Sequence, residues 1–311
     1  MSLTLIILTK NEEVHIARAI NSAAQIADRV FVIDSGSNDA TVQIAEASGA
    51  KVLSNPFITQ AQQLNWALGQ IPPETDWVFR LDADEIITTE LAAEILERLS
   101  ALGSDVAGVC ISRRMNFLGA PVKWGGLFPT RIVRLFRYGR GRSEDRWMDE
   151  HIIVDGAVVD FKGEIVDDNL NSLTWWTEKH NAYASREALE MLNLEFCFIC
   201  RESFPSGQSS RQADLKRWLK EKLYSRLPSS FRAAAYFFYR YIIRLGILDG
   251  HKGAVFHFLQ GFWYRYLVDA KINEVKDYMR ANDLEVRLAI KHRLGIDLVE
   301  SAKPREEGLP L

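Results

Sequence analysis

Short apolar runs alternate with longer amphipathic segments over the first 112 residues of this chain. The apolar runs at residues 3–9, 29–34, 51–53, 77–81 and 106–112 are predicted as strands. A helix is expected from Asn11 or Glu12 onward, another to end at Gly49, and two more over 60–69 and 89–102. This alternation predicts βαβ units, and therefore an α/β fold with a mostly parallel sheet and helices on both faces.

The pattern changes after residue 113. Residues 113–146 are rich in Arg and Gly, residues 150–170 alternate like strands, and the chain looks mostly helical from Thr174. Residues 201–212 have the composition of a linker. We therefore expect a catalytic α/β domain at 1–170, a helical extension and linker at 171–210, and a basic aromatic helical region at 211–311.

Charge is divided unevenly along the 311 residues. The formal net charge is -3, made of -10 over residues 1–210 and +7 over residues 211–311. An acidic body with a basic, aromatic tail indicates an anionic partner such as a membrane surface, although ordinary surface variation is the alternative. Nucleic acid is not expected, because the arginine-rich run is not interleaved with stacking aromatics.

Two C-terminal segments combine aromatic and basic residues. Over 231–248, apolar residues recur at helical spacing with Arg232, Arg240 and Arg244 on one flank, and a second aromatic segment covers 255–268. Such helices suit the surface of anionic lipid, although they would also suit packing on the catalytic domain. The sequence contains no charge-free stretch of about 18 apolar residues, so no transmembrane helix is predicted. The three cysteines and the absence of a signal sequence indicate a reducing compartment.

Two carboxylates one residue apart, Asp82 and Asp84, follow the apolar run Trp77-Val78-Phe79. If the strand continues, they share one face and repel each other, which a divalent cation would relieve. The alternative is a solvated aspartate-rich turn. Asp34 ends the second predicted strand and is well placed to accept hydrogen bonds from a nucleobase or ribose. The first strand–helix loop lacks the glycine patterns of dinucleotide-binding and P-loop proteins.

Four segments carry a family resemblance in order and at suitable spacing. They are Ile7-Leu8-Thr9-Lys10-Asn11-Glu12, Val32-Ile33-Asp34-Ser35-Gly36-Ser37-Asn38-Asp39, Gln63-Leu64-Asn65 and Leu81-Asp82-Ala83-Asp84-Glu85. Over about residues 1–170 the chain resembles a family 2 glycosyltransferase of the GT-A fold, and it is most similar to the bacterial lipopolysaccharide-core β-glucosyltransferase subgroup. Asp149-Glu150-His151 and Gly246-Ile247-Leu248-Asp249-Gly250 resemble further elements of that subgroup.

The resemblance implies roles for individual residues. Thr9, Glu12 and Asp34 would contact the uridine, Asp82 the ribose and diphosphate, and Asp84 the metal, with Asp82 beside it. Asn65 matches a donor-binding position. The family often has a basic residue just before it, where this chain has Leu64, so Gln62 or Gln63 would have to substitute.

The arginine-rich run gives two further candidates. Arg131 and Arg134 are the members expected to bind the donor diphosphate or a phosphorylated acceptor, because guanidinium groups bind phosphates bidentately. A solvated face is the alternative.

The catalytic base should come from a different segment than the metal ligands. Asp149 and Glu150 are adjacent, and on an extended segment their side chains point to opposite sides, so one of them would be the base. Alignment with the family element favours Glu150. The alternative is a surface cluster in which these acids pair with Arg142 or Arg146.

Together these features predict an inverting glycosyltransferase that depends on Mg²⁺ or Mn²⁺. It would move a hexose from a UDP-sugar to a membrane-associated glycan acceptor such as lipopolysaccharide core. The resemblance to the β-glucosyltransferase subgroup implies that this hexose is glucose. The alternatives are a polyprenyl-phosphate glycosyltransferase and a non-catalytic scaffold of a polysaccharide assembly complex. The expected location is the cytoplasm, peripheral on the inner face of the bacterial plasma membrane. The sequence assigns no oligomeric state.

Overall fold

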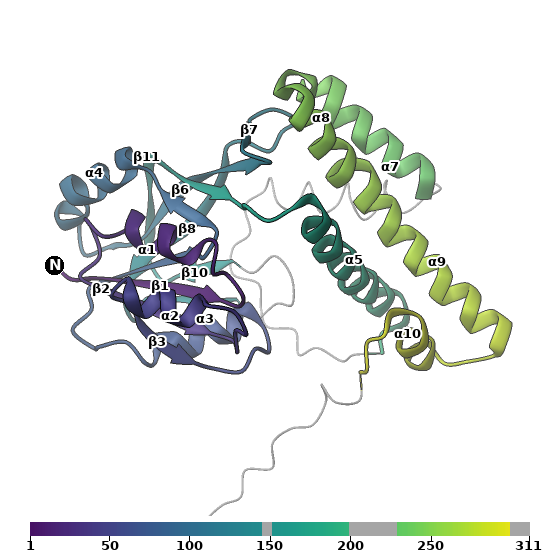
Figure 1. Ribbon diagram of the computed structural model, residues 1–311, viewed down its shortest axis with the longest axis horizontal. Coiled ribbons are helices and arrows are strands. Elements are labelled where there is room, and N and C mark those ends of the chain that lie inside the picture. Colours follow the sequence, from purple (N-terminus) through teal and green to yellow (C-terminus); the bar gives the residue numbers. More distant parts are fainter. Residues whose placement is uncertain (145–150, 199–228, 299–311) are drawn as a thin grey trace, which may run out of the picture. The chain divides into compact units, whose positions relative to one another are not determined.

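The computed structural model describes residues 1–144, 151–198 and 229–298. Within these ranges the chain forms two compact units. The first comprises Met1–Ser172 together with Ile242–Ala254, and the second comprises Leu173–Tyr241 with the chain from Val255 onward. The first unit is therefore discontinuous in sequence, since a segment near residue 250 returns to it (Figure 1).

The first unit is built around one nine-stranded sheet. Its strands lie in the order β3-β2-β1-β4-β8-β6-β11-β5, and β7 pairs with β6. Strands β1, β2, β3, β4, β6 and β11 run in one direction, whereas β5, β7 and β8 run against them. The prediction of an α/β fold with a mostly parallel sheet is confirmed. The strands are β1 (Leu3–Thr9), β2 (Arg29–Asp34), β3 (Lys51–Ser54), β4 (Trp77–Asp82), β5 (Glu85–Ile87), β6 (Val106–Phe117), β7 (Ala120–Val122), β8 (Thr130–Arg137) and β11 (Ala157–Asp168).

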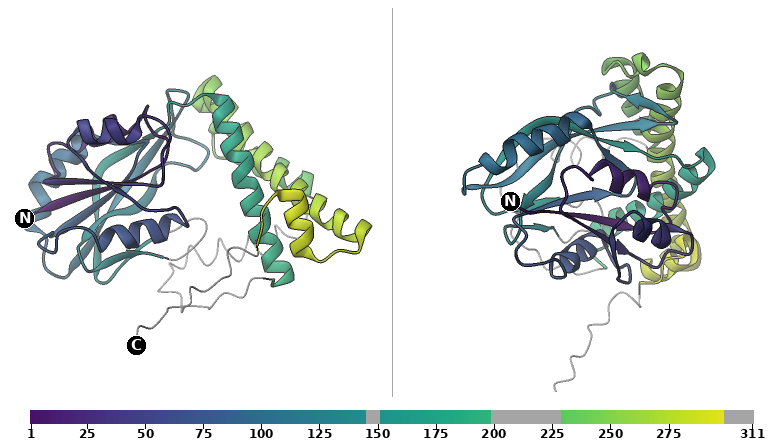
Figure 2. Two further views of the ribbon diagram at one scale, coloured as in Figure 1. Left: turned by 60° about the horizontal axis from the view of Figure 1, so that its bottom comes forward. Right: turned by 60° about the vertical axis from the view of Figure 1, so that its left-hand side comes forward.

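Helices cover both faces of this sheet, because successive strand residues point to opposite sides (Figures 1 and 2). On β1, Leu3, Leu5 and Ile7 pack in a core with helices α1, α2 and α4, whereas Ile6 packs in a second core with α3. A 3₁₀ turn follows α4, and a small ribbon of β9 and β10 lies beside the main sheet. These elements are α1 (Ile16–Ser22), α2 (Thr41–Ala47), α3 (Gln60–Leu68), α4 (Thr89–Arg98), the 3₁₀ turn (Leu99–Ala101), β9 (Gly141–Ser143) and β10 (Ile152–Val154).

Two local expectations differ from the structure. Helix α1 begins at Ile16 rather than at Asn11 or Glu12, because Asn11 has a left-handed backbone (φ 56°) and the loop's polar groups bond elsewhere. Strand β8 falls within residues 113–146, where the sequence predicted no strand, and it inserts antiparallel between β4 and β6. Its arginines interrupt the apolar run that would have signalled a strand.

The described part of the second unit is helical. Ala184, Ala188 and Leu192 on α5 pack with Val268, Ile272 and Val275 on α9, and Ala289 and Ile290 of α10 complete this core. Helices α7 and α8 each continue into a π-helical turn. The helices are α5 (Leu173–Phe196), α7 (Ser229–Phe238), α8 (Gly250–Phe258), α9 (Tyr264–Asn282) and α10 (Val286–Leu294), and the π turns span Tyr239–Ile243 and Leu259–Trp263. Within the described ranges, no helix is both long and apolar enough to cross a bilayer.

The arginines of α7 and its π turn correct a second expectation. Arg232 forms an ion pair with Asp269 on α9, and Arg240 is buried and donates to Gln260 Oε1 at 2.7 Å. These two arginines therefore cannot form the lipid-facing flank that the sequence predicted, although Arg244 is exposed. The apolar side chains of the same helix, including Phe231 and Phe238, are the ones that face outward.

Candidate functional site

The predicted ligand-binding residues meet at one edge of the sheet. Strands β1, β2 and β4 are parallel neighbours, and in their register Thr9 lies beside Asp34 and Leu8 beside Asp82. Strand β11 runs in the same direction and ends at Asp168. Because the carboxyl ends of parallel strands meet at a single edge, this edge is where open α/β sheets bind ligands.

The loops after β1 and β2 hold each other in place. Asn11 N–H donates to Ser37 Oγ at 2.8 Å, and Asn38 N–H donates to Asn11 Oδ1 at 2.8 Å. Ala40 N–H donates to Glu13 Oε2 at 3.0 Å. The polar residues of both sequence motifs thus cross-brace two loops, which fixes the backbone around the strand ends.

The three residues predicted to contact uridine have different surroundings. Asp34 accepts the N–H groups of Gly36 and Ser37 at 2.9 and 3.0 Å and the Ser37 hydroxyl at 2.5 Å. Glu12 Oε2 lies 2.6 Å from Nδ1 of His15. Among the described residues, the buried Thr9 hydroxyl has no hydrogen-bond partner. Since buried polar atoms are nearly always bonded, this hydroxyl retains an unused hydrogen-bonding capacity at the edge of the sheet.

His15 joins this loop to the end of β11. The ring is fully buried, and its Nε2 accepts the Leu170 N–H at 2.8 Å. Its Nδ1 therefore carries the proton and donates to Glu12. Beside it, Arg18 Nη1 forms an ion pair with Asp168 at 2.7 Å. Two contacts thus tie the start of α1 to the segment that follows β11.

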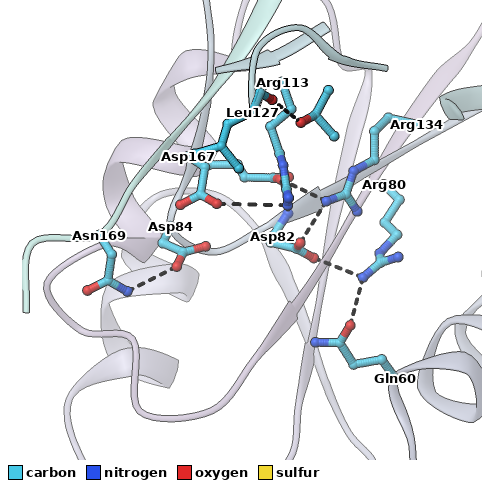
Figure 3. Close-up of polar contacts among 11 residues, drawn as sticks. Gln60, Arg80, Asp82, Asp84, Arg113, Leu127, Arg134, Asp167 and Asn169 are labelled. Atoms are coloured by element: carbon cyan, nitrogen blue, oxygen red, sulfur yellow. Dashed lines mark hydrogen bonds and ion pairs between the residues drawn. The ribbon is translucent and has the colours of Figure 1, made fainter. Parts of the chain in front are cut away.

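Asp82 is enclosed by arginines (Figure 3). Its carboxylate accepts from Arg134 at 2.7 Å and from Arg80 at 3.1 Å, and Arg80 also donates to Gln60. Burial opposes ionisation of Asp82, but the charges of Arg134 and Arg80 outweigh it and hold the pKa well below its usual value. Asp82 is therefore a permanently charged group whose charge is already compensated.

Asp84 lies in the turn after β4, so the expectation that it continues the strand beside Asp82 is wrong. Its Oδ2 accepts from Asn169 Nδ2 at 3.0 Å (Figure 3). Asp167, at the end of β11, lies 3.8 Å from Arg113. Burial, and then the charge of Asp84, raise the pKa of Asp167 to about 8. Among the described residues of this cluster, Asp84 is the carboxylate without an ion-pair partner, so uncompensated negative charge centres on Asp84, beside the Asp167 carboxyl.

This donor set fits a divalent cation only in part. Carboxylate oxygens are the ligands that Mg²⁺ and Mn²⁺ prefer, and a cation there would remove the repulsion that raises the Asp167 pKa. Within residues 1–144, 151–198 and 229–298, however, no group of three or more His, Cys, Asp or Glu side chains is arranged around one metal position. Substrate phosphates and water would have to complete the coordination of a cation held by two carboxylates.

Arg134 reaches the cluster through a β-bulge. Val109 of β6 faces Leu135, but the next residue, Cys110, faces Val133, so Arg134 is the extra residue of β8. Bulges re-aim side chains next to functional sites. The buried Arg134 guanidinium bonds both Asp82 and Glu85 at 2.7 Å, and their charges outweigh its burial and raise its pKa further.

Three other arginines of the run, Arg131, Arg137 and Arg140, bond elsewhere. Arg131 is exposed and pairs with Asp160 at 2.5 Å. Arg137 and Arg140 donate to backbone carbonyls, including those of Val106 and Ser104. The structure therefore brings Arg134 into the carboxylate cluster and leaves Arg131 in a separate ion pair.

Asn65 also has a protein partner. Its Nδ2 donates to the Ser143 carbonyl at 3.0 Å, and its Oδ1 accepts the Ser143 N–H at 2.9 Å. Both polar atoms of the amide are thus used to hold β9. The buried Gln63 bonds Ser35 and Asn55. The candidate bases Asp149 and Glu150 lie outside the described residues.

Sequence reasoning did not single out Arg113, Asp167 or His15. Asp167-Asp168 had a signal similar to that of Asp82 and Asp84, namely two closely spaced acids at the end of a segment predicted to be extended. His15 and Arg113 carried no local signal, because their partners are far along the chain. His15, for example, bonds a residue 155 positions later.

Part of this chain is similar to known proteins. Residues 4–145 match the model of glycosyl transferase family 2. An uncharacterized glycosyltransferase of Rickettsia typhi is 47% identical over 89 residues, which is 29% of this chain and 30% of that protein. The lipopolysaccharide core biosynthesis glycosyltransferase LpsC of Rhizobium meliloti is 29% identical over 164 residues, which is 51% of this chain and 59% of LpsC. The chain thus spans well under two thirds of the length of these relatives.

Among solved structures, a glucosyl-3-phosphoglycerate synthase from Mycobacterium tuberculosis, in complex with Mn²⁺, UDP and phosphoglyceric acid, is 25% identical. The match covers 37% of this chain and 43% of that one, with a TM-score of 0.31.

Proposed function

We propose that the protein, whose residues 4–145 match the model of glycosyl transferase family 2, moves a hexose, glucose by the subgroup it resembles, from a UDP-sugar to a membrane-associated glycan acceptor. The observation that carries the proposal is the edge of the sheet where Thr9, Asp34, Asp82, Asp84 and Asp167 end parallel strands or follow them. A buried hydroxyl without a partner among the described residues, and the Asp84 carboxylate beside Asp167, suit a nucleotide diphosphate bound together with a divalent cation.

The donor would lie across the ends of β1, β2 and β4. The Thr9 hydroxyl can bond the polar edge of the uracil, with Asp34 and Glu12 beside it on the braced loops. Asp82 would face the ribose and diphosphate, with its own charge held by Arg80 and Arg134. Asp84 and Asp167 are the carboxylates that would hold a divalent cation, and such an ion supplies charge neutralisation to the departing diphosphate.

Inverting transfer also needs a base that takes the proton of the acceptor hydroxyl. We assign this role to Glu150, with Asp149 as its neighbour. Asn65 bonds both backbone groups of Ser143, seven residues before Glu150 in the sequence. Arg131, exposed on β8, would bind a phosphorylated acceptor by exchanging its ion pair with Asp160 for the phosphate.

The acceptor class is supported by LpsC, whose name assigns it to lipopolysaccharide core biosynthesis. Since such acceptors are membrane-borne, we place the protein on the inner face of the plasma membrane as a peripheral enzyme.

The first test is hydrolysis of a panel of UDP-, GDP- and CDP-linked hexoses with Mn²⁺, Mg²⁺ or EDTA. We expect slow release of UDP from UDP-glucose, lost in EDTA and in Asp84→Ala. Asp155→Ala, an exposed acid in the same unit, is the matched control and should behave as wild type. Turnover of a GDP- or CDP-linked hexose instead would contradict the assignment of a UDP-sugar as donor. Full activity in EDTA would contradict the proposed metal dependence.

The second test concerns the base. Glu150→Gln keeps the size of the side chain but cannot accept a proton, so it should lower the transfer rate by about two to four orders of magnitude. UDP affinity should not change. Asp149→Asn should lower the transfer rate less than Glu150→Gln does. If Asp149→Asn has the larger effect, Asp149 is the base.

A further inference from the structure

An exposed apolar surface of the first unit is formed by two segments far apart in sequence. One is the tip after β6 and the loop after β7, with Leu118 and Trp124, and the other is the returning segment with Leu245, Ile247 and Leu248. These five side chains are 37–58% exposed. We call them, with the basic residues described below, the hairpin patch. Contiguous exposed apolar surface marks a site of interaction.

The two segments are fixed to each other by several contacts. The Asp249 carboxylate accepts the N–H of Lys123 at 2.9 Å and that of Trp124 at 3.1 Å. Gly125 N–H donates to the Arg244 carbonyl at 2.9 Å, and Lys252 Nζ donates to the Leu118 carbonyl at 2.6 Å. The patch is thus a built surface rather than two loops that happen to be apolar.

Two of its leucines adopt a backbone conformation that bulky residues avoid. Leu118 has φ 50° and Leu245 has φ 59°, both in the left-handed region. Glycine or asparagine would occupy these turns at lower energetic cost. Leucine at both positions places an apolar side chain outward on a tight turn. The energetic cost of this backbone conformation is offset where the side chain inserts into a binding partner.

The charge around the apolar residues is positive. Lys123, Arg244 and Lys252 are exposed. Asp249 is the sole acidic residue of the stretches 118–126 and 242–252, and its carboxylate already accepts two backbone N–H groups. Apolar side chains with a tryptophan, surrounded by basic groups, match the interface of a bilayer that contains anionic lipid.

We propose that the hairpin patch is the surface by which this protein docks on an anionic membrane. Leu118, Trp124, Ile247 and Leu248 would enter the headgroup region, and Lys123, Arg244 and Lys252 would lie against the lipid phosphates. This inference deepens the proposed function, on which it rests for the membrane-borne acceptor. It names a specific surface of the catalytic unit in place of the basic helix flank that the sequence predicted.

Co-sedimentation of the full chain with phosphatidylcholine vesicles, with and without phosphatidylglycerol, tests this. Wild type should bind the anionic vesicles, and the double variant Ile247→Ser/Leu248→Ser should bind them at least about tenfold more weakly. Lys123→Gln should weaken binding about fivefold. Leu96→Ser and Lys162→Gln alter an exposed leucine and an exposed lysine of the same unit, so they are the matched controls and should bind as wild type.

Each contrary result overturns the assignment. Wild type that does not bind, equal binding to neutral vesicles, or patch variants that bind as well as the controls would each remove it. UDP binding, measured calorimetrically in the same variants, separates this inference from the proposed function. Loss of vesicle binding with intact UDP binding supports the patch. If the protein binds anionic vesicles but has no affinity for UDP, the docking role of the hairpin patch is supported and the assignment of a UDP-sugar donor is contradicted.

Discussion

At the scale of single residues, one unusual group of the candidate site is the Thr9 hydroxyl, which is buried without a hydrogen-bond partner among the described residues, as are Nε of Arg80 and of Arg134. Leaving a buried hydroxyl unbonded costs about 1–3 kcal/mol, so a folded protein keeps one mainly where something else bonds it. Its neighbours Glu12 and Asp34 are satisfied within the protein. Removal of the Thr9 hydroxyl should therefore weaken nucleotide binding without lowering the stability of the fold.

Thr9→Val retains the shape of the side chain and removes the hydroxyl. We expect UDP affinity to fall about tenfold, while the free energy of unfolding stays the same or rises by about 1 kcal/mol. Isothermal titration with UDP and urea unfolding measure the two quantities. Thr4→Val on the same strand is the control, because Thr4 bonds Thr75 at 3.0 Å. It should lower stability and leave UDP affinity unchanged, and a Thr9→Val protein that behaves likewise would refute the ligand role.

The Asp167 carboxyl gives a pH dependence. Its pKa is raised to about 8 in the folded protein by burial and the Asp84 charge, whereas the unfolded value is 3.8. The unfolded chain therefore loses this proton first, and the contribution of Asp167 to stability is lost as the pH rises from about 4 through about 8. Each pKa unit corresponds to about 1.4 kcal/mol, so the loss should reach a few kcal/mol.

Asp167→Asn should remove this dependence. Urea unfolding at pH 5, 7 and 9 should show wild type losing stability relative to the variant across that range. Parallel pH profiles for the two proteins would mean that Asp167 ionises normally.

At the scale of secondary-structure elements, one side chain of α3, that of Asn65, bonds the backbone of β9. Asn65 satisfies both backbone groups of Ser143. Family resemblance assigned Asn65 to the donor, whereas the structure gives its amide to a strand that precedes the candidate base. These roles differ in what a substitution would change.

Asn65→Ala should lower the transfer rate by up to about 10²-fold, because the segment after β9 loses its support. UDP affinity should stay within about twofold of wild type. Steady-state kinetics with a UDP titration distinguish the roles, and Gln70→Ala, an exposed residue just after the same helix, is the control. A large loss of UDP affinity would instead indicate that Asn65 contacts the sugar-nucleotide donor.

The same elements show how far the sequence could predict this fold. The strands β1, β2 and β4 are continuous apolar runs with turn residues at their ends, so their bounds, and the convergence of Thr9, Asp34 and Asp82, followed from the pattern. Strand β8 could not be predicted, because Arg131, Arg134 and Arg137 interrupt it and each finds its partner only in the folded sheet. The bulge that aims Arg134 has no signal in the sequence.

At the scale of the whole molecule, the first unit depends on residues that follow much of the second in sequence. Asp249 connects the returning segment to the loop after β7 by two backbone hydrogen bonds. The Gly246–Asp249 motif, which the sequence marked as a family feature, thus has a structural role in the catalytic unit.

Asp249→Ala should release that loop. Losing two hydrogen bonds to a charged acceptor should lower the free energy of unfolding by about 2 kcal/mol. Limited proteolysis should cut residues 118–127 faster than in wild type, with fragments identified by mass spectrometry. Glu274→Ala, an exposed acid on α9, serves as the control. Unchanged cleavage would show that other contacts hold the loop.

The discontinuity of the first unit has a consequence for the newborn chain. Asp249 leaves the ribosome 126 residues after Lys123, whose backbone it binds. At translation rates of about 5–20 residues per second, the interval is roughly 6–25 s. During this time the sheet can already assemble, while the loop after β7 still lacks the carboxylate that fixes it. The nucleotide edge can therefore mature early in synthesis, and the surface around Trp124 is completed only after the first helices of the second unit have been translated.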